Sequence, residues 1–202
     1  MATKKTSANG TTAIPNTPSI SIPAPDIQTA HFRLVGTTSL ICHAWSDKAK
    51  KMMLDKQMKK ATTGKLAKDP EQDFYDSLYP MPDGEGYGFP AIAWKAAMVR
   101  AGTYLDLKMT FLRGVFHVPD GYVRIDGKPE PREDMVRLQG NTADIRYRGE
   151  FMPWAVELPI QFNARVITHE QLANLLVTAG FSVGVGEWRP EKDGNHGMWE
   201  VA

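Results

Sequence analysis

The chain has 202 residues, of which 42% are hydrophobic and 23% are charged, and its formal net charge is +1. This composition suits one ordinary domain with a real core, and the balanced charge excludes a uniformly basic nucleic-acid binder but not a local basic patch. The single cysteine, Cys42, excludes both an internal disulfide framework and a zinc site of several cysteines, and no apolar run reaches the ~20 residues of a membrane span. We therefore expect a cytoplasmic protein without a membrane segment, and no residue pattern indicates a metal or a cofactor.

The amino-terminal residues 1–25 are rich in Thr, Ser, Pro and Asn and cannot bury much apolar surface. They are predicted to form a disordered tail, followed by a single domain over residues 26–202. Alternating apolar residues over 31–35 and again over 40–44 favour a strand that bends at Gly36.

A basic insertion is predicted over residues 46–87, where Ser46 is a good N-cap for a helix. Between positions 48 and 68 there are eight lysines and a single acid, Asp55. The pattern favours an exposed basic helix or a partly disordered arm. Four of its lysines are candidate phosphate contacts: Lys48, Lys51, Lys59 and Lys60. The alternative is a solubilising helix face, and the two interpretations are about equal.

Pro90 begins a predicted helix that ends near residue 105, since a proline is well tolerated in a first helical turn. Residues 109–166 then read as four strands, and the pairs Asp120-Gly121, Asp126-Gly127 and Gly140-Asn141 mark hairpin turns between them.

The next helix begins at Thr168, which forms a capping-box pattern with Gln171, and Gly180 is its predicted stop. A last strand is expected near residues 198–201. The element order condenses to the βαββαβ arrangement of a ferredoxin-like, RRM-like α+β domain with hairpin elaborations.

The closing stretch "FSVGVGEWRPEKDGNHGMWEVA" places glycines, tryptophans and cations directly after a helix. It does not fit a dinucleotide fingerprint or a P-loop, because it follows a helix and lacks the required glycine and Gly-Lys-Ser/Thr. Its glycines allow close backbone approach to phosphates, and its aromatic and cationic side chains suit single strands. The candidate contacts here are Gly184, Gly186, Trp188, Arg189, Lys192 and Gly194. The alternative is that both tryptophans anchor the core, which we favour for Trp199.

A second candidate lies in the predicted hairpin "VRLQGNTADIRYRGEF", where Arg146 and Arg148 flank Tyr147. Interleaved charge and aromatic surface suits a strand-binding hairpin. Ordinary cross-strand pairing with the nearby acids explains the same pattern nearly as well.

The helix and loop "LANLLVTAGFSVGVGEWRPEKDGNHGMWEV" resemble the carboxy-terminal signature of the RAMP superfamily, the ferredoxin-like proteins of CRISPR systems. "GFPAIAWKAAMVRAG" is similar to the family's first-helix motif, although "AIAW" replaces the usual serine-containing turn. The chain also looks like uncharacterised phage and prophage proteins. The resemblance implies binding of single-stranded RNA or DNA by copies of the protein arranged along the strand. It assigns roles to Lys95, Gly184, Gly186, Arg189 and Gly194.

The most favoured function is therefore non-catalytic binding of single-stranded nucleic acid, and Arg189→Ala is predicted to weaken binding without unfolding the protein. Two alternatives stay open. A metal-independent RNA endonuclease would use His43 or His196 as general acid or base, although a structural histidine is favoured at each position. A phage assembly protein would bind only protein partners.

Overall fold

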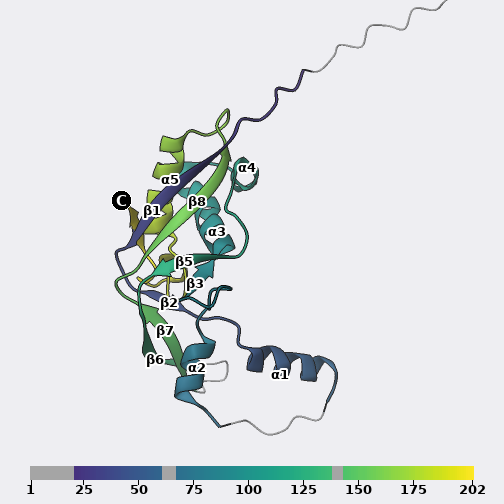
Figure 1. Ribbon diagram of the computed structural model, residues 1–202, viewed down its shortest axis with the longest axis vertical. Helices are drawn as coiled ribbons and strands as arrows, with labels where there is room; N and C mark the ends of the chain where they lie inside the picture. The colour runs from purple at the N-terminus through teal and green to yellow at the C-terminus, as the bar shows by residue number, and fades with distance from the viewer. Residues whose placement is uncertain (1–20, 61–66, 138–142) are drawn as a thin grey trace, which may run out of the picture.

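The computed structural model describes residues 21–60, 67–137 and 143–202 (Figure 1). Within these ranges the chain is an α+β protein with two antiparallel sheets and five α-helices. Residues 21–26 are exposed and have no regular secondary structure. The rest of the predicted tail and the predicted Gly140-Asn141 turn lie outside the described residues.

The larger sheet is built around two long strands, β1 (Ile27–Gly36) and β8 (Ala155–Asn163), which pair with Phe32 opposite Leu158. Its strand order is β3-β5-β8-β1-β9, and β4 also pairs with β8. The remaining strands of this sheet are β3 (Gly88–Pro90), β4 (Phe116–His117), β5 (Tyr122–Asp126) and β9 (Trp199–Val201).

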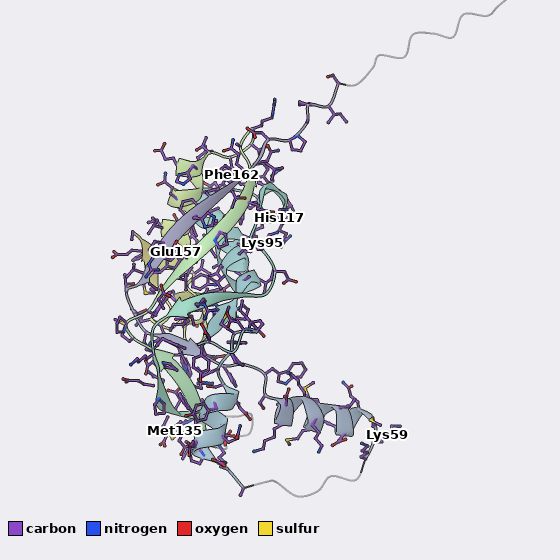
Figure 2. The ribbon with its side chains drawn as sticks, in the orientation of Figure 1. Lys59, Lys95, His117, Met135, Glu157 and Phe162 are labelled. Carbon is purple, nitrogen blue, oxygen red and sulfur yellow. The ribbon has the colours of Figure 1, made fainter. Side chains whose placement is uncertain are left out.

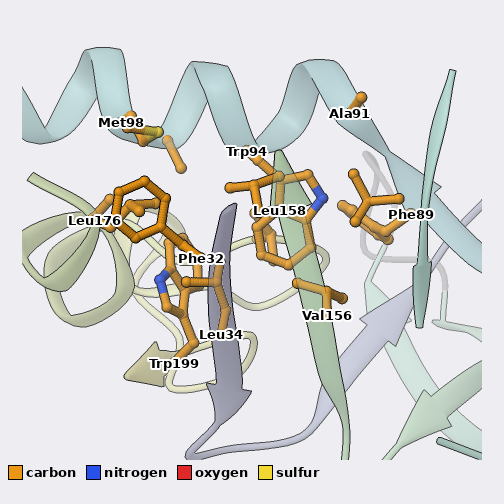
Figure 3. Close-up of a cluster of buried hydrophobic side chains, with 14 of the residues drawn as sticks. Phe32, Leu34, Phe89, Ala91, Trp94, Met98, Val156, Leu158, Leu176 and Trp199 are labelled. Carbon is orange, nitrogen blue, oxygen red and sulfur yellow. The ribbon is translucent and has the colours of Figure 1, made fainter. Parts of the chain in front are cut away.

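Helices α3 (Ala91–Ala101) and α5 (His169–Ser182) supply the apolar side chains that cover one face of this sheet. Figure 3 shows Trp94 and Met98 of α3 meeting Phe32 and Leu158 of the strands. The other face is polar: Arg33 pairs there with Asp126 at 2.5 Å and with Glu157 at 3.3 Å. The two faces follow directly from the alternation of apolar and polar residues along the strands.

The smaller sheet contains β2 (Leu40–Cys42), β7 (Ala143–Phe151) and β6 (Pro129–Arg137), in the order β2-β7-β6. The prediction of one strand bent at Gly36 is wrong, because β1 and β2 belong to different sheets. A Cβ atom at Gly36 would lie 2.2 Å from the ring of Trp154, so the glycine lets the chain pass this ring where it leaves the first sheet.

Two of the predicted hairpins are also wrong. Strand β5 pairs with β3 and β8, whereas β6 pairs with β7, so the Asp126-Gly127 turn connects the two sheets. The Asp120-Gly121 turn follows β4 and precedes β5, and both of these strands pair with β8 rather than with each other. The β6–β7 pairing, by contrast, agrees with the predicted hairpin.

The first of the four strands predicted over residues 109–166, residues 109–118, is largely a helix, α4 (Met109–Val115). Leu112 and Val115 are its buried positions, and their spacing of three residues is helical rather than alternating. A 3₁₀ turn, η1 (Gly102–Leu105), links α3 to this region.

Helix α5 has the predicted capping box between Thr168 and Gln171, but it continues past Gly180 to Ser182. Gly184, with φ of +68°, ends the helix, and its N–H donates to the Ala179 carbonyl at 2.9 Å. Gly180 instead allows close packing, because a Cβ there would lie 2.2 Å from the Trp199 carbonyl oxygen.

The basic insertion contains α1 (Asp47–Gln57), which Ser46 caps as predicted, and α2 (Pro70–Asp76). Helix α1 has no buried residue and projects from the body of the molecule (Figure 1). Within the described ranges, no helix is both long and apolar enough to cross a membrane.

Candidate nucleic-acid interface

The glycine-rich loop, residues 183–198, is closely packed between α5 and β9. Gly186 has φ of +80°, and a Cβ there would lie 2.6 Å from the Ile41 carbonyl oxygen. The next residue, Glu187, donates its N–H to that carbonyl at 3.1 Å. At Gly194 a Cβ would lie 1.8 Å from the Trp188 carbonyl oxygen. These glycines are thus explained by contacts within the protein.

Arg189 stabilises this loop through hydrogen bonds to other residues of the loop. Its guanidinium donates to the Gly186 carbonyl at 3.0 Å and to a carboxylate oxygen of Glu191 at 2.8 and 3.0 Å. Glu191 also pairs with Arg100 of α3 at 2.5 Å, so the loop is tied to the helix beside it. Trp188 and Lys192 are exposed, whereas Trp199 is buried as expected.

A cavity of about 280 Å³, the helix–loop cavity, lies between α3 and the glycine-rich loop. Ala93 and Ala97 line it from the helix, Val183 and Gly186 line it from the loop, and His43 lies at its wall. The two segments that carry the family resemblance are therefore neighbours in the fold.

A second cavity of about 460 Å³, the cationic cavity, lies between α3 and α4. Its lining combines apolar side chains, including Ile92 and Met109, with Lys95, Arg100 and Arg113, and none of the described residues that line it is acidic. Lys95 Nζ lies 2.9 Å from Nδ1 of His117. The cationic cavity shares Ala96 and Arg100 with the helix–loop cavity, so the two adjoin.

The two candidate histidines occupy different settings. His43 is exposed and its Nδ1 lies 3.2 Å from Oε1 of Glu187, whereas Nδ1 of His196 lies 2.8 Å from the Ser39 hydroxyl. Only His43 lines the helix–loop cavity. The hydrogen bond to His43 is the main cause that holds the pKa of Glu187 below its ordinary value, and it outweighs the opposing effect of burial.

Arg148 is buried, with 2% of its surface exposed, and does not present a guanidinium to solvent. It donates to Asp134 at 2.9 Å and lies 3.8 Å from Glu187, which matches the cross-strand alternative. We therefore remove Arg148 from the phosphate contacts. Arg146 lines a cavity of about 240 Å³ at the same hairpin. Its Nε lies 3.9 Å from Oδ2 of Asp144.

The lysines of the insertion lie apart from this site. Figure 2 places Lys59 near the far end of α1, well separated from Lys95 on α3. Lys60 pairs with Asp55 at 3.0 Å, Lys48 lies 3.9 Å from Asp73, and Lys51 is exposed. The predicted cations thus form two groups rather than one surface.

Sequence reasoning missed Arg100 and Arg113. One helical face of α3 presents Ile92, Lys95, Ala96, Val99 and Arg100, which follow the spacing i, i+3, i+4, i+7 and i+8. This helical spacing could have been recognised in the sequence, and it would have placed Arg100 on the same face as Lys95. Arg113 was hidden by the incorrect strand prediction for residues 109–118.

No protein-family model matches the chain, and no curated protein matches it significantly. Within residues 21–60, 67–137 and 143–202, no three His, Cys, Asp or Glu side chains gather in a way that could hold a metal ion.

Proposed function

We propose that the protein binds single-stranded nucleic acid, RNA or DNA, across α3, α4 and the glycine-rich loop. The observation that carries the proposal is the cationic cavity, where Lys95, Arg100 and Arg113 surround apolar side chains. Arg100 pairs with Glu191 beside the cavity, and no acidic residue is among the described residues that line it. Cations of this kind neutralise phosphates, and the apolar floor suits the faces of unpaired bases.

The chain order supports a ferredoxin-like core for this binding site. When the other elements are treated as insertions, the chain gives the order βαββαβ from β1, α3, β5, β8, α5 and β9. The four strands of this set lie in the sheet in the order β5-β8-β1-β9. The resemblance to RAMP proteins fits this core and favours several copies side by side on one strand, in the cytoplasm.

The helix side of the molecule is a better binding surface than the open face of the large sheet. RRM domains stack bases on aromatic side chains of that face. Here the central strands β1 and β8 present His31, Arg33, Glu157 and Gln161, and Arg33 is paired with acids. We therefore propose that the nucleic-acid strand binds to α3, α4 and the glycine-rich loop.

Fluorescence anisotropy with labelled 20-nucleotide poly(dT), poly(U) and duplex DNA tests the proposal over a range of salt concentrations. The single strands should bind at low salt and lose affinity as salt rises. The double variant Lys95→Ala/Arg113→Ala should lower the slope of log K against log salt by about 1.4, or about 0.7 for each lost phosphate contact. The exposed pair Lys128→Ala/Arg165→Ala is the matched control and should leave the slope unchanged.

Absence of salt-sensitive binding at low ionic strength would contradict the proposal and favour an assembly protein. The same samples test for an enzyme. If labelled RNA is cut without metal and His43→Ala abolishes the cutting, the endonuclease alternative replaces simple binding, because His43 lies at the wall of the helix–loop cavity.

A further inference from the structure

A third cavity is lined by aromatic side chains that the sequence patterns did not single out. This aromatic cavity, of about 440 Å³, lies where the chain leaves β2 and enters α1, next to the end of α2. Its aromatic lining consists of Trp45, Tyr75, Tyr79 and Tyr122. The volume falls within the roughly 300–1,000 Å³ that is usual for small-ligand sites.

Three of the four rings that line this cavity are exposed, and Tyr79 is partly buried. Trp45 is 58% exposed, Tyr75 is 52% exposed and Tyr122 is 42% exposed. Tyr79 and Tyr122 lie with ring centroids 5.6 Å apart and tilted by 46°, so they form one aromatic wall. Burial is the main cause that raises the pKa of Tyr79 to about 12.

The polar groups of the cavity favour a base over a phosphate. Asp47 and Asp76 line it, and Lys50, which also lines it, is paired with Asp47 at 2.9 Å. Carboxylates repel a phosphate, but they accept hydrogen bonds from the N–H groups on base edges. Aromatic walls with carboxylate acceptors are the chemistry of a nucleobase site.

The aromatic cavity also continues the surface already described. It shares Tyr79 with the helix–loop cavity, which in turn shares Ala96 and Arg100 with the cationic cavity. A strand bound through its phosphates at α3 and α4 can therefore pass toward the aromatic rings.

We infer that the aromatic cavity of Trp45, Tyr75, Tyr79 and Tyr122 receives an unstacked nucleobase of the bound strand. This inference rests on the proposed function. It predicts a preference for single strands, because the bases of a duplex are already stacked on their neighbours and cannot enter.

The test compares 20-nucleotide poly(dT) with an abasic strand that has the same number of phosphates. Trp45→Ala should weaken binding of poly(dT) by between about fivefold and about a hundredfold, the effect of losing one stacked base, and should leave abasic binding unchanged. Trp45→Phe should retain most of the affinity. Tyr104→Ala, an exposed aromatic outside the cavity, is the matched control.

A 2-aminopurine base in the strand gives a second readout, since its fluorescence should be quenched on binding to the wild type and less so with Trp45→Ala. Equal loss of affinity for both strands, or no loss for either, would overturn the inference. In those cases the proposed function stands provided that Lys95→Ala/Arg113→Ala still lowers the salt slope. If neither strand binds the wild type at low salt, the proposed function fails as well.

Discussion

At the residue scale, Arg189 stabilises the glycine-rich loop by hydrogen bonds rather than presenting a fully exposed charge to solvent. Its hydrogen bonds to Gly186 and Glu191 are made by a side chain that is only 28% exposed. We expect Arg189→Ala to lower the free energy of unfolding by about 1–2 kcal/mol, while the domain stays folded, because partly buried acceptors lose their donor. Urea denaturation measures this change.

Lys192→Ala is the matched control for Arg189→Ala, since Lys192 lies in the same loop and is exposed. Its free energy of unfolding should stay within about 0.5 kcal/mol of the wild type. Equal stability of the two variants would show that Arg189 does not brace the loop. Because Arg189→Ala is expected to lower the free energy of unfolding, any effect of this variant on nucleic-acid affinity must be compared with its loss of stability.

The thiol of Cys42 is expected to be unreactive in the folded protein. The side chain is fully buried, and burial raises its pKa to about 12, so the reactive thiolate is scarce at neutral pH. We expect the folded protein to react with Ellman's reagent at pH 8 far more slowly than the protein in guanidinium chloride. Similar rates in the two states would show that β2 opens readily.

At the element scale, the sequence predicted elements with strong local signals and failed where tertiary contacts decide. The capping box at Thr168 and the cap at Ser46 were correct because each is formed by residues three positions apart. Gly180 was misread as a helix stop, since its reason for being glycine is Trp199, which lies on another element. The pairing of β5 with β8 likewise depends on contacts far along the chain.

Two helical glycines allow a paired test of this distinction. Gly180→Ala should lower the free energy of unfolding by about 1–3 kcal/mol, because the added methyl group meets the backbone oxygen of Trp199. Gly114→Ala in α4 should raise it by about 0.5–1 kcal/mol, since nothing lies within 4 Å of the new methyl group and alanine is the better helix former. Thermal and urea unfolding measure both. Destabilisation by both variants would contradict the packing described for α4.

At the scale of the whole molecule, the candidate site joins segments that are distant in the sequence. The resemblance indicated α3 and the glycine-rich loop, and both line the helix–loop cavity. Arg113 and the aromatic cavity were not predicted, because they depend on how α4, α2 and the insertion fold back on the core. Lys59 and Lys95 were both predicted to contact nucleic acid, yet they lie far apart (Figure 2).

Glu187 connects these parts, because it lies in the glycine-rich loop and contacts both His43 after β2 and Arg148 of β7. Its pKa is lowered from 4.5, chiefly by the hydrogen bond with His43 and further by the charges of Arg148 and Arg146, against the effect of burial. A carboxyl group with a lowered pKa stabilises the folded state above its unfolded pKa, and this stabilisation is lost as the pH falls through the folded pKa.

We therefore expect wild type to exceed Glu187→Gln in free energy of unfolding above about pH 5, and the difference to shrink as the pH falls below that range. Urea denaturation between pH 3 and pH 7 measures it. In a His43→Ala background the difference at neutral pH should be smaller, because the main cause of the lowered pKa is gone. A difference that stays constant over the whole pH range would show that the carboxylate of Glu187 does not tie the glycine-rich loop to the second sheet.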